Sequence, residues 1–465
     1  MKRRTFGLLA STSLVAIATR GASASAQTAT FASLSQTTLT PLGSERAGNA
    51  AGTIPEWTGG MTTIPVGVSW APGKQMAPDF FAAEAPLYVI TAENMVQYES
   101  QLSEGVKYQI QKDELSLKVY PTHRTAAAPQ WVYDNIVENS TRAQLEPGGG
   151  RLGFTGGYGG IPFPVPDTTD PLAAGAQIMW NHTCRWQGSS FTQIGASYCM
   201  IDGVLTLAGS GITQSTFPYY VKNGSVSNFA GYQYENHETL IGPSTEIGTQ
   251  IVDRFATDPY IHPDILWELL QGQGRVRKAP ELSYDTPSGF LDGIGNYDEY
   301  TVFNGALNEY DWKLIGKKEF LIPYNNNALR LATAQEAHGP KFINPNVLRW
   351  ELHRVWVVEA TLHPGSRNVL PKRVFYVDED TWAATIADCW DANGNIYKLD
   401  MAFNHVRPDV PGTMPLNSIT YNLQTGYYAT ISGPWGNAPY NKPTSYAPIP
   451  PSAFEPQVMA AAAAY

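Results

Sequence analysis

Apolar and polar residues alternate with a period of two along much of this chain, a pattern typical of β-strands. In residues 310–325, YDWKLIGKKEFLIPYN, Trp312 and Leu314 fall on one face, and the alternation shifts phase near Gly316 before it resumes at Phe320. A phase shift at a glycine indicates a β-bulge or a tight bend. We therefore predict a long strand here that bends in its middle.

The clearest pattern lies in residues 349–403. Trp350 and Trp356 share one face of a first strand, and Trp382 lies on one face of a later strand. The Asn-Gly pair at 393–394 is the strongest short hairpin signal. This region predicts an antiparallel meander of long, aromatic strands.

Further strands are predicted upstream of this meander. Residues 246–255 and 265–280 have strand-like patterns, and the Asp-Gly and Asn-Gly pairs at 202–203 and 223–224 are hairpin signals. The chain after about residue 188 is therefore mostly β.

Two helices are predicted before these strands. Thr91 is a suitable N-cap for a helix whose apolar residues recur at Met95, Tyr98, Leu102 and Val106. A second helix begins at Asp170-Pro171, with the aspartate as N-cap and the proline in the first turn, and runs to about Trp186.

These elements predict a mainly β chain of α+β type in four parts. Residues 1–26 form a signal peptide, and residues 27–170 form an arm and a helical segment that packs on the sheet. Residues 171–450 form a curved antiparallel β domain with helices, and residues 451–465 form a tail. The Gly- and Pro-rich stretch before the second helix lacks the Gly-Lys-Ser/Thr ending of a phosphate loop, so a structural loop is favoured.

Composition and charge narrow the class of protein. Aromatic residues make up 12% of the 465 residues and charged residues only 15%. The basic start and the apolar run of residues 1–26 indicate an export signal cleaved near Ala26, with the general and the twin-arginine export routes both open. The formal net charge is −10, so a nucleic-acid partner is excluded. We expect a periplasmic protein without a membrane-spanning segment.

Cysteine and acidic residues give few signs of a metal site. Cys184 and Cys199 are close enough in sequence for a disulfide, and buried free thiols are an equal alternative. The acidic turn at residues 378–380 resembles a calcium cluster only weakly, and no zinc spacing is present. No metal and no cofactor are predicted.

Catalytic motifs are equally scarce. The sequence holds no Gly-x-Ser-x-Gly elbow. His182 is interpreted as structural, and His353 is expected on a polar outer face of a strand. Acid pairs such as Asp292 and Asp298 cannot be placed across a substrate from the sequence. The sequence therefore predicts no catalytic residue.

Several long motifs resemble one bacterial family. They include LTPLGSERAGNAAGTIPEWTGG, VYPTHRTAAAPQWVYDN, WNHTCRW, RVRKAPELSYDTP and RWELHRVWVVEATLHPGSRNVLPKRVFYVDED, which are spread over nearly the whole chain after the signal. On these motifs the chain resembles the domain of unknown function 1329 family of exported proteins. It departs from the family pattern at Gln271 and Gly274, so that turn carries one positive charge fewer.

The family in turn resembles the outer-membrane lipoprotein-sorting carriers LolA and LolB. This resemblance implies a strongly curved antiparallel sheet, an incomplete barrel, with helices covering its open side and a cavity for a hydrophobic small molecule or lipid. It also implies an RND-type (MMPL-like) exporter and an outer-membrane protein as partners.

The resemblance favours aromatic strand residues as the wall of the cavity, with two arginines near an anionic head group. The predicted ligand-binding residues are Trp267, Trp312, Leu314, Phe320, Trp350, Trp356, Phe375, Trp382, Arg275 and Arg277. The favoured function is a non-enzymatic periplasmic carrier. Two alternatives remain open: an envelope hydrolase of a hydrophobic substrate, whose acids would converge inside the cavity, and a structural adaptor with a solid core.

Overall fold

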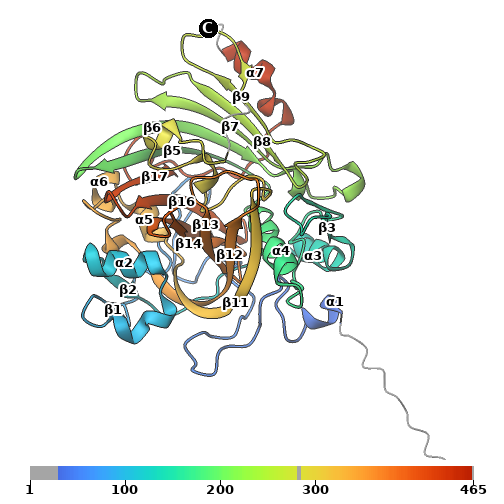
Figure 1. Ribbon diagram of the computed structural model, residues 1–465, viewed down its shortest axis with the longest axis vertical. Coiled ribbons are helices and arrows are strands. Elements are labelled where there is room, and N and C mark those ends of the chain that lie inside the picture. The colour runs from blue at the N-terminus through green and yellow to red at the C-terminus, as the bar shows by residue number, and fades with distance from the viewer. Residues whose placement is uncertain (1–29, 280–283, 463–465) are drawn as a thin grey trace, which may run out of the picture.

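The computed structural model describes residues 30–279 and 284–462, and its strands span most of this length (Figure 1). The predicted signal peptide lies outside the described residues. The strands are β1 Tyr88–Ile90, β2 Leu117–Val119, β3 Gln144–Leu145, β4 Phe154–Thr155, β5 Ser190–Ile201, β6 Val204–Thr216, β7 Tyr232–Gly242, β8 Gln250–Ala256, β9 Ile265–Leu269, β10 Arg277–Lys278, β11 Tyr310–Pro323, β12 Trp350–Leu362, β13 Lys372–Asp378, β14 Ala384–Trp390, β15 Ile396–Arg407, β16 Gly412–Asn422 and β17 Tyr427–Gly433.

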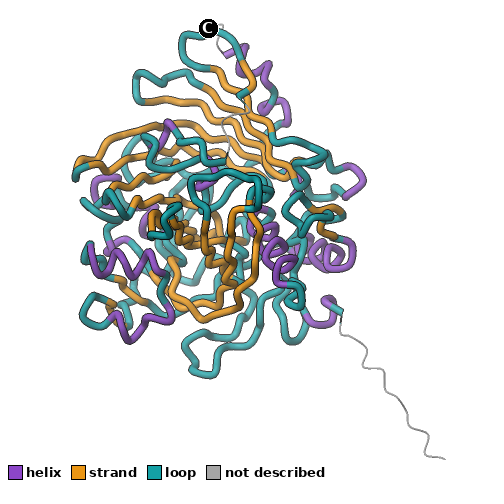
Figure 2. Tube along the Cα trace, in the orientation of Figure 1, coloured by secondary structure: helices purple, strands orange, loops and turns teal. Residues whose placement is uncertain are grey.

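The longer helices α2, α3 and α4 lie beside the sheet (Figure 2). The α-helices are α1 Phe31–Leu34, α2 Glu104–Lys112, α3 Gln130–Arg142, α4 Pro171–Thr183, α5 Asn327–Leu331, α6 Ala334–Ala337 and α7 Pro456–Ala462. The 3-10 helices are η1 Met95–Gln101, η2 Pro218–Tyr220, η3 Val226–Asn228, η4 Gly289–Leu291, η5 Tyr297–Glu299, η6 Pro345–Val347 and η7 Pro451–Phe454. No helix within the described ranges is both long enough and apolar enough to cross a membrane.

One 15-stranded sheet organises the molecule. Its order is β1-β2-β12-β13-β14-β15-β16-β17-β5-β6-β7-β8-β9-β10, and β11 pairs with β12 beside this path. The pairings are antiparallel apart from a single bridge between β2 and β12. Because the path ends at β1 and β10 among the described residues, the sheet is curved but open, as predicted (Figure 1).

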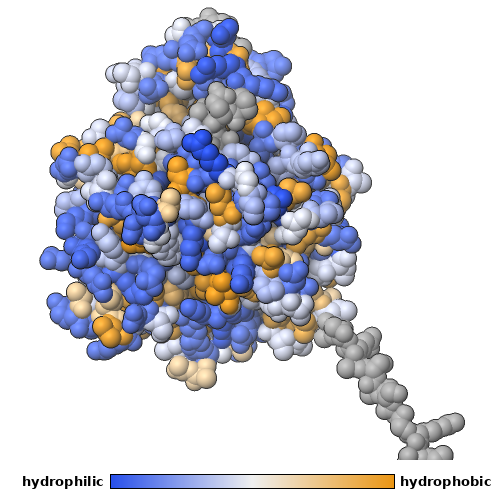
Figure 3. Space-filling view, viewed as in Figure 1, coloured by the Kyte–Doolittle hydropathy of each residue, from blue (hydrophilic) through white to orange (hydrophobic). Residues whose placement is uncertain are grey.

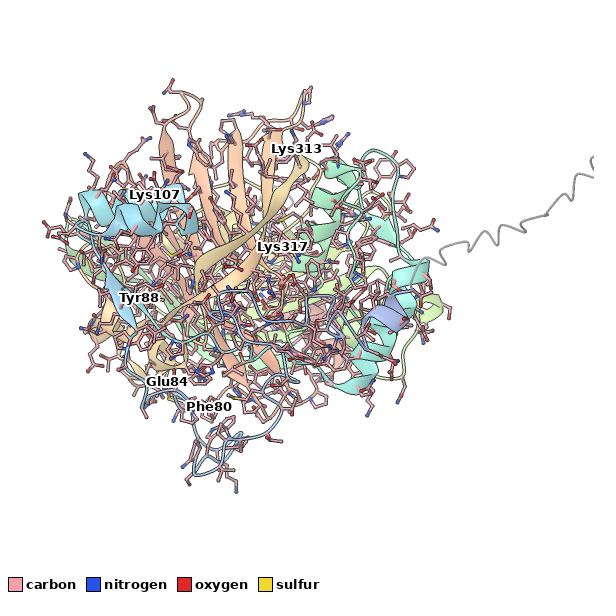
Figure 4. All side chains as sticks on the ribbon, turned by 90° about the horizontal axis from the view of Figure 1, so that it is seen from below. Phe80, Glu84, Tyr88, Lys107, Lys313 and Lys317 are labelled. Atoms are coloured by element: carbon pink, nitrogen blue, oxygen red, sulfur yellow. The ribbon has the colours of Figure 1, made fainter. Side chains whose placement is uncertain are left out.

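The predicted bend in β11 is confirmed. Its pairing with β12 shifts register between Leu314 and Gly316, and Gly316 has a φ of 154°. Trp312 and Leu314 share the same hydrophobic cluster, as the alternation predicted. Figure 4 shows Lys313 and Lys317 along this bent strand.

Both faces of the β12–β15 region are buried. Val357 and Val358 are neighbours on β12 but belong to different hydrophobic clusters. One cluster includes residues of η1 and α2, and the other includes residues of α3 and α4. The two helical segments therefore cover opposite faces, and the meander predicted for residues 349–403 becomes a solid core.

The helix predicted after Thr91 is split in two. Ser103 ends the first part because its Oγ accepts a hydrogen bond from Val106 N at 3.3 Å and so starts α2 anew. Asp388 on β14 also accepts hydrogen bonds from the N–H groups of Glu104 and Gly105. A negatively charged side chain at a helix N-terminus is favourable, and it fixes α2 to the sheet.

The second predicted helix is confirmed as α4. Asp170 caps it by accepting hydrogen bonds from the backbone of Leu172 and Ala173, and Pro171 occupies the first turn. Gly175 lets the helix lie close to β11, since a Cβ there would be 2.5 Å from the Trp312 carbonyl oxygen. The close approach places the end of α4 against the sheet.

The β5–β10 half follows the predicted hairpins with two differences. The turn at residues 202–203 joins β5 to β6 as expected. The tight hairpin predicted at 223–224 is not formed, because residues 217–231 connect β6 to β7 and contain two 3-10 turns. The strand predicted for 265–280 consists of β9 and β10, which a turn at residues 270–273 separates.

Candidate functional site

A cavity of about 420 Å³ lies between strands β5–β9 and strands β15–β17 of the sheet. Its wall comes from the inner face of β5–β9, from β15, β16 and β17, and from the end of α4. The segment 284–306, which contains η4 and η5, contributes the remaining side. This volume falls in the lower part of the range of about 300–1,000 Å³ that is common for ligand pockets.

Strand alternation decides which residues of β7 and β8 reach the cavity. Tyr234, Asn236 and Glu238 on β7 line it, as do Ile251, Asp253 and Phe255 on β8. Both sets have a spacing of two, so the residues between them point to the other face. That outer face is covered by the C-terminal segment, because His237 Nδ1 lies 2.8 Å from the Ala453 carbonyl oxygen.

Aromatic and apolar groups make up much of the wall. These residues include Phe191, Phe217, Tyr234, Phe255, Tyr284, Phe290, Tyr297, Tyr300, Phe303, Ile251, Ile265, Leu266 and Ile431. The rings of Tyr297 and Tyr300 stack with their centroids 6.0 Å apart. Rings that carry hydroxyl groups give a wall that is apolar but can still form hydrogen bonds.

Three carboxyl groups also line the cavity, and burial raises the pKa of each. The pKa values are about 7 for Glu238, about 8 for Asp253 and about 7 for Asp264. For Asp253, the nearby carboxyl groups of Glu238 and Asp264 raise it further, whereas a 3.4 Å hydrogen bond from Asn236 opposes the rise. All three groups therefore hold protons over part of the neutral pH range.

One basic residue, Arg185, lines the cavity among the described residues. It follows the last turn of α4, and its Nη1 donates a hydrogen bond of 2.6 Å to the His182 carbonyl oxygen. His182 itself is structural, as predicted, because its ring nitrogens lie 3.1 Å from the Phe303 oxygen and 2.9 Å from the Ala384 nitrogen. Burial holds the pKa of His182 well below its usual range, with a further decrease from Arg185.

None of the ten residues predicted as ligand contacts lines this cavity. Trp312, Leu314, Phe375 and Trp382 lie in the core cluster beside α4, and Trp356 packs against that cluster. The reason is size: the largest rings fill the space between the sheet and its covering helices. Their role as ligand contacts remains a prediction.

The other predicted contacts are spread over three places. Phe320 and Trp350 lie in the core cluster beside α2. Trp267 packs on the outer face of β9 against the C-terminal segment, with the Arg254 guanidinium 5.2 Å from its ring centroid. Arg277 is exposed and binds Glu268, and Arg275 is exposed in the preceding turn.

The alternation along β7 and β8 was the signal that could have identified the wall. Residues 234, 236 and 238 place a tyrosine, an amide and an acid on one face, and residue 253 adds an acid on the adjacent strand. A face with such mixed polarity does not suit a dry core. The sequence prediction instead followed the tryptophans.

His353 is buried rather than on the polar outer face predicted for it, with 1% of its surface exposed. Its ring lies 3.9 Å from that of Tyr324, and its Nε2 lies 3.1 Å from Glu351 Oε2. The acidic turn at residues 378–380 is buried as well, and Trp382 Nε1, just after it, donates a hydrogen bond to the Leu42 carbonyl oxygen of the N-terminal arm. The nearby Glu351 and Asp378 raise the pKa of His353 against the effect of burial.

This buried region is an ion-pair cluster, although it has the donor types of a metal site. His353, Asp378 and Asp380 each offer a ligand atom, and these atoms lie within 4.8 Å of one another. Asp380 is already paired, because Arg124 Nε and Nη2 donate to its two oxygens at 2.8 and 2.7 Å. Lys317 Nζ lies 2.5 Å from Glu379. The bidentate Arg124 balances the charge of Asp380, whereas Asp378 Oδ1 has no hydrogen-bond partner among the described residues.

The cysteines are free in the described chain, and each is buried. In this structure Cys184 and Cys199 are therefore not bonded to each other, as in the alternative of buried free thiols. The two belong to different hydrophobic clusters. Burial raises the pKa of both thiols to about 12.

The comparisons with known proteins agree with the sequence motifs. The family described as "Protein of unknown function (DUF1329)" matches residues 89–460. The uncharacterized protein PA3922 of Pseudomonas aeruginosa is 33% identical over 404 residues, which cover 85% of each chain.

Two crystal structures are more distant. A DUF1329 family protein from Desulfovibrio piger is 13% identical with a TM-score of 0.37, over 57% of this chain and 91% of that one. A LolA superfamily protein from Nitrosomonas europaea is 12% identical with a TM-score of 0.32, over 58% of this chain and 92% of that one. By the family match over residues 89–460 and the relative that is one-third identical, the protein belongs to the DUF1329 family.

Proposed function

We propose that the protein is a periplasmic, non-enzymatic carrier that holds one hydrophobic or amphiphilic molecule in the cavity between β5–β9 and β15–β17. The cavity itself supports this proposal most directly. It is large enough for a compact ligand, and aromatic and aliphatic side chains supply much of its wall. Transfer of an apolar ligand from water into such a wall is favourable without any chemistry.

The acids in the cavity are the observation that favours a hydrolase as a second candidate. Glu238, Asp253 and Asp264 face one space, as an enzyme of this kind would require. A two-carboxylate mechanism needs one acid that is protonated and another that is ionised, with their pKa values well separated. Here burial raises the pKa of all three acids to about 7 or 8. The carrier therefore remains the better account.

The third hypothesis, an adaptor with a solid core, receives less support. It predicts no internal space, and the cavity of about 420 Å³ does not fit it. The face drawn in Figure 3 is largely hydrophilic with scattered hydrophobic residues, so this view offers no broad apolar surface for a partner.

Location and partners are further parts of the proposal. The predicted export signal in residues 1–26 supports a periplasmic location. The resemblance to lipoprotein-sorting carriers motivates an RND-type exporter and an outer-membrane protein as the donor and acceptor of the cargo.

The test is native mass spectrometry of protein purified from the periplasm, followed by solvent extraction and lipid analysis. We expect a reproducible added mass that extracts as one class of hydrophobic molecule. Ile251→Trp should remove this mass, because Ile251 lines the cavity and a larger side chain would fill it.

The matched control is Val204→Trp, since Val204 lies on the neighbouring hairpin with 62% of its surface exposed. It adds the same ring outside the cavity and should keep the cargo. Wild-type protein that stays bare after incubation with envelope lipids would refute the carrier. An unchanged added mass in folded Ile251→Trp would place the cargo elsewhere.

A further inference from the structure

Arg185 stands out among the buried charges of this protein. Only 6% of its surface is exposed, and that part faces the cavity. Burial lowers the pKa of its guanidinium to about 10, so the group stays charged at neutral pH. A buried cation normally has an anionic partner, because desolvating an unpaired charge is costly.

Three other buried arginines in the described chain have such partners. Arg124 binds Asp380, Arg373 lies 3.1 Å from Asp298, and Arg349 lies 2.7 Å from Glu84. Arg185 forms no ion pair with any described residue, including the three acids of the cavity. The cavity therefore contains a charged group whose counter-charge the described chain does not supply.

The local hydrogen bonds use only one end of the guanidinium. Nη1 donates to the His182 carbonyl oxygen and lies 3.3 Å from His182 Nδ1. Nε and Nη2 donate to no acceptor on the described residues. Capping the negative end of α4 explains the Nη1 contact. It does not explain the remaining donors of a group that has five N–H bonds.

We propose that Arg185 is an anion-binding subsite of the cavity, and that it receives the carboxylate or phosphate head of a ligand with an apolar tail. The inference rests on the proposed carrier function and names the class of cargo. The planar fork of an arginine can donate two parallel hydrogen bonds to either oxyanion.

A second unpartnered group supports this assignment. Asn417 on β16 lines the same cavity with 6% of its surface exposed, and neither its oxygen nor its nitrogen has a hydrogen-bond partner among the described residues. A buried amide without a partner is costly, and a polar ligand group in the cavity would relieve that cost. Both residues thus indicate a ligand that is polar at one point and apolar elsewhere.

The acids of the cavity do not oppose an anion while they are protonated. Burial raises the pKa of Glu238, Asp253 and Asp264 to about 7 or 8, so their negative charge is reduced at neutral pH and below. Arg185 is then the main formal charge facing the ligand.

The experiment compares three ligands with the same twelve-carbon tail: dodecanoate, dodecyl phosphate and dodecanol. Each is titrated calorimetrically into delipidated full-length mature protein, below the concentration at which the ligand forms micelles. We expect at least one of the two anions to bind about tenfold or more tightly than dodecanol, as charge-assisted hydrogen bonds require. The anion that binds with the higher affinity shows whether the cargo carries a carboxylate or a phosphate.

Arg185→Met should abolish this preference and leave the affinity for dodecanol unchanged, and Arg185→Lys should keep part of it. The matched control is Arg330→Met. Arg330 is also buried without an ion pair in the described chain, but it binds the Lys442 carbonyl oxygen and lies outside the cavity.

The possible results separate the two proposals. Equal affinity of the wild type for dodecanol and both anions overturns the anion subsite but not the carrier. A preference that survives in folded Arg185→Met also overturns the subsite. If none of the three ligands binds, the carrier proposal fails and the subsite fails with it. Should Arg185→Met not fold, the wild-type preference and Arg185→Lys still decide.

Discussion

Replacing Asp253 by asparagine should make the protein more stable at alkaline pH than the wild type. Asp253 lies on the cavity face of β8, where burial raises the pKa of its carboxyl group from 3.8 to about 8. Between these values the folded protein holds a proton that the unfolded chain has released. Stability must therefore fall as the pH rises through this window, and it must be highest below it. Asparagine cannot ionise, so the variant avoids this loss.

The size of the effect follows from the shift. A rise of roughly four pKa units corresponds to about 5–6 kcal/mol at most, at about 1.4 kcal/mol per unit. Asp253 is partly exposed, and water in the cavity that it lines weakens the effect. We therefore expect about 2–3 kcal/mol. Asn236 Nδ2 donates a hydrogen bond of 3.4 Å to Asp253 Oδ2. In the variant, the amide oxygen of the new asparagine can accept the same hydrogen bond.

Urea unfolding followed by tryptophan fluorescence at about pH 5 and about pH 8 measures the effect. The free energy of unfolding of Asp253→Asn, relative to the wild type, should increase between these two pH values. Asp134→Asn serves as the control, because Asp134 lies on the exposed face of α3. Parallel pH dependences of the wild type and Asp253→Asn would refute the assignment of a protonated carboxyl to the cavity wall.

Three further experiments test the packing of α4, a buried ion pair and the free thiols. Gly175→Ala should lower stability by about 1–3 kcal/mol in thermal or urea unfolding, because its new methyl group would meet the Trp312 carbonyl oxygen. Arg124→Met should cost about 3–5 kcal/mol, since it leaves the buried carboxylate of Asp380 unpaired; a loss below about 1 kcal/mol would contradict the buried pair. Reductant should leave the melting temperature unchanged, and Cys184 should react with thiol reagents only after unfolding; reaction in the folded state would contradict its burial.

The strands were predictable because their alternation is local. The bulge of β11 at Gly316 and the start of α4 at Asp170 each followed from a few neighbouring residues. The break before α2 combines the local cap at Ser103 with hydrogen bonds to Asp388, a residue distant in sequence that the periodicity could not reveal.

The cavity could not be predicted from the sequence, because it also depends on contacts between residues that are distant in sequence. Its wall combines residues 183–306 with residues 402–431, and these segments meet because β17 pairs with β5. Period-two patterning says which residues share a face but not what lies opposite that face. The tryptophan-rich strands therefore suggested a ligand wall, whereas the structure uses Trp312 and Trp382 to fill the core.

The pairing of β17 with β5 has a consequence for how the protein is made. The Tyr198 nitrogen and the Thr430 hydroxyl meet across 232 residues of chain. Contacts between such distant segments close large loops, so they form late and slow the folding of a domain. Until residues 427–433 emerge, β5 presents a long unpaired edge on which other chains can add strands. The newly made chain should therefore depend on a chaperone until its last strand is complete, and truncation before β17 should cause aggregation rather than a mere loss of binding.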